Sequence, residues 1–314
     1  MSNKLLVVGT IAYDAIETPF GKAEHILGGA ATYIAFAASI FNIKIGLVSV
    51  IGDDFNSNDL KLLTKRDIDV SGVEIVKGGK TFFWSGKYHI NINKRDTLDT
   101  QLNVLENFDP KVPDNWSTSN ILLLGNLHPA VQLSALKQMK VKPDLIILDS
   151  MNFWMDNFRS ILDDVISKID VLCINDEEAL QLTGQNSIRN AADAIQVLGP
   201  KYVIIKKGEH GAMLFHRDEI FVVPALPLKK VKDPTGAGDS FAGGFAGFLA
   251  QHSNTSFESM KTALVYASAM ASFTVEEFGT ESLQTVNKLN LKERLKEIEN
   301  LTKFKSQQIN LNEL

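Results

Sequence analysis

The sequence contains a single cysteine among 314 residues, which excludes a fold held together by internal disulfide bonds. Cys173 lies in the apolar stretch 171–174, where we expect it to be a small buried side chain. Dense runs of Lys or Arg are also missing, and the net charge is -5. The charge distribution therefore argues against a nucleic-acid-binding surface as the main function.

Long apolar segments are missing near the N-terminus as well. The run at 5–8 is too short to span a membrane or to act as a secretion signal, so we expect a cytoplasmic protein without a membrane partner. The sequence has no internal repeat, low-complexity tract or flexible linker. With 45% hydrophobic and 22% charged residues, it predicts one globular domain over residues 1–314.

The most informative stretch is 232–250, KDPTGAGDSF followed by AGGFAGFLA. Gly236 and Gly238 have no side chains to shield their amides, so a negatively charged group can approach the backbone closely. The apolar residues that follow predict a helix, whose first turn adds unpaired N–H donors and a partial positive charge. These features together predict an anion-binding site.

Asp239 stands inside this predicted anion site, where its charge would repel a bound phosphate unless the carboxylate has a chemical task. It could accept the proton of an attacking hydroxyl while the amides of Gly236, Ala237 and Gly238 hold the charge of a transferring phosphoryl group. The alternative is an ordinary helix-entry turn, in which an acidic residue is favoured by the helix dipole. The spacing alone leaves both interpretations open.

Apolar stretches separated by helical segments indicate βαβ units and a mainly parallel sheet. The predicted strands are 4–9, 44–52, 121–125, 145–149, 171–174 and one beginning at 202. The turn after the first strand is Gly9-Thr10-Ile11, which lacks the glycine pattern of a dinucleotide-binding dehydrogenase.

Residues 73–108 interrupt the alternation of strands and helices. The stretch 81–92 is rich in residues that favour β-structure and has no helical period, so it predicts a hairpin. Phe82, Phe83 and Trp84 place aromatic side chains on at least one of its faces.

Polar residues follow several of the predicted strands. Asn175 and Glu178 are spaced as a capping box at a helix start, and on the residues alone the cap is the favoured interpretation. At the C-terminus, Asn290 is placed to cap a final helix over 290–303.

The stretch 233–241 resembles the C-terminal signature of the ribokinase-like (PfkB) family of sugar and nucleoside kinases, and further motifs match in order along most of the chain. The resemblance implies a three-layer α/β/α sandwich with a mainly parallel central sheet and a small β-sheet lid, formed by about residues 12–25 and 74–108. It also implies ATP-dependent phosphoryl transfer to a hydroxymethyl group of a small sugar. Asp239 would then be the general base.

The resemblance also implies a set of site residues. Substrate contacts would come from Asp14, Gly28, Gly29, Tyr33, Phe82, Trp84 and Asn152, and nucleotide contacts from Lys207, Gly208, Gly211, Thr235, Gly236, Gly238 and Gly279. Asn175 and Glu178 would hold Mg²⁺ through water, and Asp233 and Thr235 would line a candidate K⁺ site. The lid would serve as the interface of a homodimer.

The sequence departs from the family at Tyr33, where many members have Asn, and at Ala30, where ribokinase itself has Lys. Both positions belong to the substrate pocket, so ribose is less strongly indicated. An adenosine-type nucleoside kinase is the alternative, because Tyr33 and the lid aromatics could stack on a base. A catalytically idle nucleotide-binding regulator is a third reading, which the intact Gly-Ala-Gly-Asp sequence disfavours.

Overall fold

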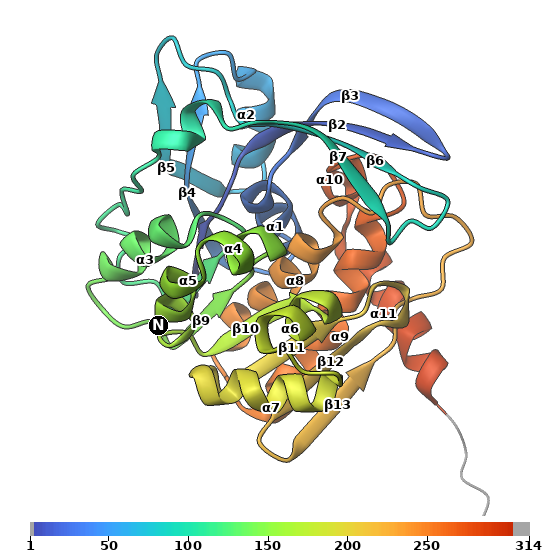
Figure 1. Ribbon diagram of the computed structural model, residues 1–314. Coiled ribbons are helices and arrows are strands. Elements are labelled where there is room, and N and C mark those ends of the chain that lie inside the picture. The colour runs from blue at the N-terminus through green and yellow to red at the C-terminus, as the bar shows by residue number, and fades with distance from the viewer. Residues whose placement is uncertain (1–2, 304–314) are drawn as a thin grey trace, which may run out of the picture.

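The computed structural model describes residues 3–303, which form a nine-stranded sheet flanked by helices and a separate four-stranded sheet (Figure 1). The strand order of the large sheet is β13-β12-β11-β10-β9-β8-β1-β4-β5. Neighbours from β11 to β5 pair in parallel, whereas β12 and β13 add antiparallel pairs at one edge. The strands are β1 (Lys4–Val8), β4 (Lys44–Gly52), β5 (Ile68–Val76), β8 (Ile121–Leu124), β9 (Leu145–Leu148), β10 (Val171–Asn175), β11 (Tyr202–Lys206), β12 (Ala212–His216) and β13 (Glu219–Val223).

The apolar strands are buried on both faces, which explains why they read as continuous apolar runs. In β1, Leu5 and Val7 join one core cluster, whereas Leu6 and Val8 join the other. Successive side chains of a strand point to opposite faces, so each face of the sheet has its own core.

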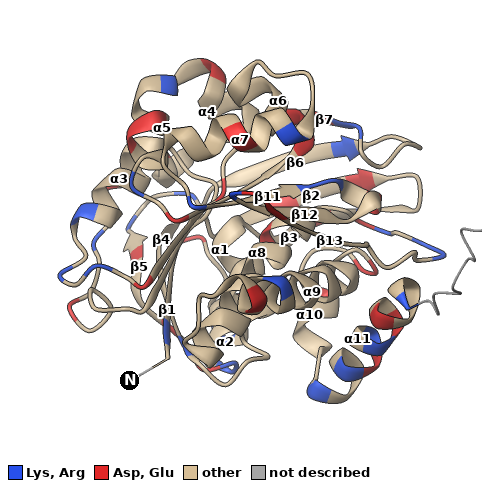
Figure 2. Cartoon of the chain, turned by 90° about the horizontal axis from the view of Figure 1, so that it is seen from below, with Lys and Arg blue, Asp and Glu red and all other residues tan. Residues whose placement is uncertain are grey.

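Helices cover both faces of the large sheet, and Figure 2 shows the two layers on either side of the strands. One layer contains α1 (Ala30–Ala38), α2 (Ser57–Thr64), α8 (Ala237–His252), α9 (Phe257–Thr274), α10 (Glu281–Thr285) and α11 (Lys288–Thr302). The other contains α3 (Pro129–Lys137), α4 (Asn152–Asn157), α5 (Arg159–Ile166), α6 (Asp176–Thr183) and α7 (Ile188–Leu198). The predicted three-layer sandwich is confirmed.

Helix α8 is packed between α1 and α9, and almost its whole length is buried. A Cβ atom on Gly243 would lie 2.4 Å from the carbonyl oxygen of Ile34 in α1. Only glycine allows the two helix backbones to approach this closely. The close packing fixes the position of the α8 N-terminus, where the glycine-rich loop ends.

The four-stranded sheet has the order β3-β2-β6-β7 and lies apart from the large sheet, at the upper right of Figure 1. Its strands are β2 (Ala12–Thr18), β3 (Gly21–Gly28), β6 (Phe83–Tyr88) and β7 (Arg95–Gln101). β2 and β6 pair in parallel, and the outer pairs are antiparallel. Ile16, Tyr88 and Phe278 form an apolar cluster beneath it.

Two details differ from the sequence-based expectation. The stretch 81–92 supplies one strand of a hairpin, not both, because β6 pairs with β7 further along the chain. The last helix is capped by Asn287, whose side chain accepts the amides of Leu289 and Asn290. The Asn290 side chain instead accepts a hydrogen bond from the Asn287 amide, so Asn290 is the third helical residue of the capping box.

Among residues 3–303, no helix has both the length and the apolar character needed to cross a membrane.

Candidate active site

Polar side chains gather where the parallel strands end. Asn175 and Lys206 are the last residues of β10 and β11 and face each other in the strand register. Asp149 directly follows β9. Because the carboxyl ends of parallel strands lie at one edge of the sheet, these residues form the expected position for a ligand.

The glycine-rich loop enters α8 through Gly236, which has a left-handed conformation with φ 74°. A Cβ atom there would lie 2.3 Å from the Tyr33 ring, so only glycine fits. The Ala237 amide donates to the Pro234 carbonyl at 3.2 Å and closes the turn. Within residues 3–303, the amides of Gly236 and Gly238 have no hydrogen-bond acceptor, so these two of the three predicted donors remain available.

Asp239 is the third residue of α8 and is half-buried. Its Oδ1 atom is buried and has no hydrogen-bond partner in the described part of the chain, so the carboxylate does not cap the helix. Burial raises the pKa of Asp239 to about 7, Asp149 adds to the rise, and Lys206 and Arg95 oppose it. A carboxyl group with this pKa can take up and release a proton near neutral pH.

Asp233 braces the loop from behind and is fully buried. Its two carboxylate oxygens accept the amides of Thr235 at 2.9 Å and Gly279 at 3.0 Å, which orders the loop without an ion. The Thr235 hydroxyl donates to the Tyr88 hydroxyl at 3.0 Å. This bond ties the loop to the four-stranded sheet, and no sequence motif pointed to Tyr88.

Asp14 of β2 lies close enough to Asp239 for their charges to interact, and it is 4% exposed. A Cβ atom on Gly28 would lie 1.9 Å from Oδ2 of Asp14, so the carboxyl group occupies the space that the glycine leaves free. Burial raises the pKa of Asp14 to about 8; Asp233 and Asp239 raise it further, whereas the Gly29 amide and Arg95 lower it. A carboxyl group with this pKa can hold its proton near pH 7 and then donate a hydrogen bond.

Tyr33 is 1% exposed, and its ring packs against Gly236. Its hydroxyl is buried without a hydrogen-bond partner among the described residues. Burial raises the pKa of Tyr33, and Asp14 and other nearby carboxylates add to the rise. Because the ring packs under the loop, its face is not open for stacking on a ligand.

The aromatic residues of the four-stranded sheet differ in position. The Trp84 ring packs over Gly86, where a Cβ atom would lie 2.1 Å from it, and contacts the cluster beneath the sheet. Phe82 precedes β6, is half-buried and accepts the Tyr13 amide through its carbonyl. The Arg95 guanidinium lies 5.2 Å from the Trp84 ring centre, and its charge acts on Asp14, Glu178 and Asp239.

Asn175 and Glu178 form the capping box of α6. The Asn175 side chain accepts the Glu178 amide at 2.7 Å, and Glu178 Oε2 accepts the Asn175 amide at 2.8 Å. Burial raises the pKa of Glu178 to about 7, Lys206 opposes the rise, and Asp149 adds to it. The Asn152 side chain donates to Gln181 of α6, so it is tied to this helix.

The described residues contain no group of three or more His, Cys, Asp or Glu side chains that could hold a metal ion by themselves. The oxygen donors of Asn175 and Glu178 nevertheless suit Mg²⁺, which keeps several waters and needs only one or two protein oxygens beside phosphate ligands.

A cavity of about 460 Å³ opens beside the glycine-rich loop. Its walls include Ala237 and Gly238 of α8, Gly208 and Gly211 around the turn η2 (Gly208–His210), and Ile92, Asn93, Lys206, Phe241 and Ala271. The sequence pointed to Lys207, but Lys206 is the lysine in the wall. The strand register could have identified it, since Lys206 is aligned with Asn175. Thr235 lies in the glycine-rich loop and Gly279 in the turn before α10, and neither residue is part of this wall.

The glycine-rich loop, the buried aspartate and the adjoining cavity can be compared with known proteins. The pattern described as "pfkB family carbohydrate kinase" matches residues 2–286. The chain belongs to the pfkB family of carbohydrate kinases. A cytidine kinase of Thermococcus kodakarensis is 32% identical over 77% of this chain and 86% of its own length.

Solved structures agree with this family assignment. A nucleoside kinase of Methanocaldococcus jannaschii, described as an archaeal member of the ribokinase family, has a TM-score of 0.75 and 21% identity, covering 94% of this chain and 98% of its own. A putative ribokinase II of E. coli in complex with ATP and Mg²⁺ has a TM-score of 0.77 and 19% identity, covering 94% and 99%. At these identities the likeness confirms the ribokinase-like fold.

Proposed function

We propose that this kinase transfers the γ-phosphoryl group of ATP to a hydroxymethyl group of a small polyhydroxy acceptor. The supporting observation is the buried, unpartnered Oδ1 of Asp239 beside the open amides of the loop. The acceptor oxygen forms a bond to the γ-phosphorus as the bond from that phosphorus to the β–γ bridging oxygen breaks. The hydroxyl proton passes to Asp239, and ADP leaves.

The nucleotide is assigned to the 460 Å³ cavity, because Gly238 and Lys206 lie in its wall beside apolar residues such as Leu226, Phe241 and Val275. The amides of Gly236 and Gly238 face the transferring phosphoryl group and stabilise its charge. Mg²⁺, when bound through water to Asn175 and Glu178, would neutralise charge on the phosphates. Asp233 and Thr235 are the proposed K⁺ ligands, and an ion there would stiffen a loop that is already braced.

The four-stranded sheet is proposed as the lid of the acceptor pocket. Asp14 of β2 and Arg95 of β7 are the groups of this sheet whose charges interact with Asp239. The Thr235–Tyr88 hydrogen bond would couple the position of the lid to the conformation of the glycine-rich loop. With its pKa raised to about 8, Asp14 would donate a hydrogen bond to an acceptor oxygen and orient the attacking hydroxyl.

A nucleoside is the first acceptor class to test, because the cytidine kinase relative is 32% identical over most of both chains. A small sugar is the second, since the polar groups at Asp14, the Gly28–Gly29 turn and Asn152 are suited to hydroxyls rather than to a base. Phe82 and Trp84 would border the base or the sugar ring. The ring of Tyr33 is not available for stacking, which removes one reason for an adenosine-type pocket.

An acceptor panel tests the proposal. ADP release is measured with cytidine, uridine, adenosine, inosine, ribose, fructose and inositol, each with and without K⁺. We expect turnover that depends on an acceptor and at least ~10-fold higher kcat/KM for one nucleoside than for ribose. Ribose or fructose as the best acceptor would replace the nucleoside assignment. ATP binding without turnover on any acceptor would favour the idle regulator.

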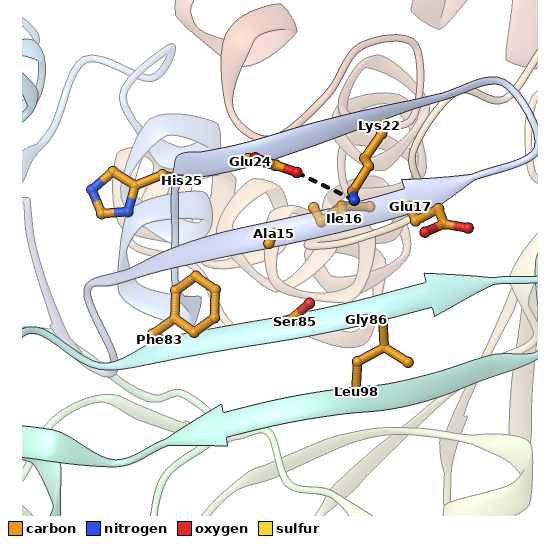
Figure 3. Close-up of a pocket in the computed structure, with 10 residues that line it drawn as sticks. All are labelled: Ala15, Ile16, Glu17, Lys22, Glu24, His25, Phe83, Ser85, Gly86 and Leu98. Atoms are coloured by element: carbon orange, nitrogen blue, oxygen red, sulfur yellow. Dashed lines mark ion pairs between the residues drawn. The ribbon is translucent and has the colours of Figure 1, made fainter.

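The outer face of the lid is proposed as a homodimer interface. A groove of about 310 Å³ crosses it, and Figure 3 shows Phe83, Ser85 and Leu98 beside the Lys22–Glu24 ion pair on this face. A second copy would bring the same apolar strip and the same mixed charges, which are self-complementary in a two-fold arrangement.

A further inference from the structure

Lys206 and Asp149 form a buried ion pair at the carboxyl edge of the large sheet. The Lys206 Nζ atom lies 2.8 Å from Asp149 Oδ1, and the two side chains are 17% and 9% exposed. Removing two charges from water costs more free energy than a single such contact returns, unless further groups compensate. The pair also lies at the edge of the sheet where ligands bind, so a bound ligand can act as a further partner for its charges.

The carboxylates around Lys206 outnumber it. Its charge acts on Glu178 of α6 and Asp239 of α8 as well as on Asp149. Asp149, Cys173 and Glu178 raise the pKa of Lys206 despite its burial, so the ammonium stays charged. One cation thus lies among three carboxylates that come from three different parts of the chain.

The ammonium also faces the glycine-rich loop. Its Nζ atom would lie 3.1 Å from a Cβ atom on Gly238, and it is the nearest heavy atom to that position. Lys206, Ala237 and Gly238 line the same cavity. A phosphoryl group held by the Gly238 amide would therefore lie within reach of the lysine.

We propose that Lys206 contacts the transferring phosphoryl group as a catalytic cation, and that Asp149 is the positioning residue that holds its ammonium in place. This inference rests on the proposed phosphoryl transfer. The open amides of the loop provide partial positive charge, whereas Lys206 provides a full charge on the cavity side. Asp149 fixes the direction of the ammonium, because a flexible lysine otherwise places its charge imprecisely.

A second lysine–aspartate pair lies at the opposite end of the same strands. Lys201 precedes β11, and its Nζ lies 3.4 Å from Asp170 Oδ1. Lys201 is 68% exposed, and Asp170 accepts the Ile146 amide at 3.0 Å. The Lys201–Asp170 pair is therefore a matched control with similar chemistry and no contact to the loop.

The surroundings of Asp239 determine what a pH profile reports. Besides Lys206 of β11, the charged and titratable groups that act on it are Asp14 of β2, Tyr33 of α1, Arg95 of β7, Asp149 after β9 and Cys173 of β10. Burial raises the pKa of Asp239, and Lys206 counteracts this. Removing the lysine charge should therefore shift the acid limb of the profile of kcat against pH to higher pH.

The experiment compares Lys206→Met, Lys206→Arg and Lys201→Met in steady-state assays with cytidine and ribose. We expect Lys206→Met to lower kcat by ~10²–10³-fold, a loss comparable to that of a charge-stabilising donor at a reaction centre. Its acid limb should move to higher pH. Lys206→Arg should recover at least ~10-fold of the loss, because it keeps the charge. Lys201→Met should keep wild-type kcat and an unshifted limb.

A double variant separates chemistry from stability. Lys206→Met leaves the Asp149 charge unpaired and destabilises this edge of the sheet, whereas Lys206→Met with Asp149→Asn removes the pair as a unit. A purely structural pair predicts that the double variant regains wild-type kcat and the wild-type acid limb. The proposal predicts a folded protein, checked by its melting temperature, that remains impaired. Wild-type kcat in either Lys206→Met protein would overturn it.

Binding measurements keep this inference distinct from the proposed function. Calorimetry compares AMP-PNP and ADP, which differ in the terminal phosphoryl group. We expect Lys206→Met to lose ~10–100-fold affinity for AMP-PNP and little for ADP, since a charge-assisted contact is lost. If no acceptor is turned over, the function fails, but this selective loss would still support the lysine contact. Equal losses for both nucleotides would contradict it.

Discussion

The two sides of the candidate active site are built differently. The proposed phosphate side consists mainly of backbone: Gly236 and Gly238 at the start of a helix that is packed between α1 and α9. The proposed acceptor side consists of side chains, Asp14 and Arg95, carried by strands of a separate small sheet. Backbone groups would hold the transferred group independently of the acceptor, whereas side chains can differ from one acceptor to another. Asp239 lies where the two sides meet.

The largest effect is expected where both sides meet. Asp239→Asn should lower kcat by ~10²–10⁴-fold because the proton acceptor is lost, while the shape of the residue is retained. Calorimetry with ADP should give wild-type affinity, since the cavity wall does not include Asp239. A variant with full turnover would show that the two sides meet at another residue.

A smaller effect is expected on the acceptor side alone. Asp14→Ala should lower kcat/KM for the acceptor by ~10–100-fold through the loss of a hydrogen bond, with an unchanged KM for ATP. Gly28→Ala should act through the same residue, because its Cβ would displace the Asp14 carboxyl group.

The double variant tests this dependence. Asp14→Ala and Gly28→Ala should be non-additive in combination, as two changes to one contact are. Additive losses, or an equal loss of nucleotide binding, would mean that the two sides are not separable.

Residues of the proposed phosphate side can be picked out from the sequence more readily than those of the proposed acceptor side, for a physical reason. The loop and Asp239 are consecutive in the chain, so their chemistry can be read from a short motif. Tyr88 reaches the site only through the pairing of β6 with β2, which no local pattern reveals. Arg95 lies in the stretch predicted as a polar lid edge, but its position beside the Trp84 ring depends on the pairing of β6 with β7. Lys206 was missed in favour of Lys207, because the strand register decides which lysine faces the cavity.

Burial of the carboxyl groups should make the melting temperature depend on pH by a few degrees. The folded-state pKa values of Asp14, Glu178 and Asp239 are about 8, 7 and 7, above those of an unfolded chain. Their stabilising contribution is complete below about pH 4 and is lost as pH rises through about 7 to 8. Asp239→Asn should therefore melt higher than the wild type near pH 8.5, and the difference should shrink near pH 5.5.

A matched substitution provides the control for this melting experiment. Asp218→Asn changes a carboxylate in the exposed turn between β12 and β13, and it should show the same small difference at both pH values. A constant difference for Asp239→Asn would mean that Asp239 is not raised in pKa.

The smallest effect on catalysis is expected on the outer face of the lid. Leu98 is 58% exposed in the groove, and Leu98→Glu should weaken a dimer by at least ~10-fold in sedimentation equilibrium. Val197→Glu, at an exposed site on α7, should leave the dimer intact. A wild-type protein that is monomeric at all concentrations would contradict the dimer proposal without affecting the kinase assignment.

The pH dependence of kcat/KM, measured with the best acceptor for the wild type and for Asp239→Asn, tests the role of Asp239 most directly. The wild type should gain activity with rising pH along an acid limb whose apparent pKa is about 7, as the carboxyl group becomes able to accept a proton. The residual activity of the variant should lack this limb. An identical limb in both proteins would contradict the assignment of Asp239 as the base.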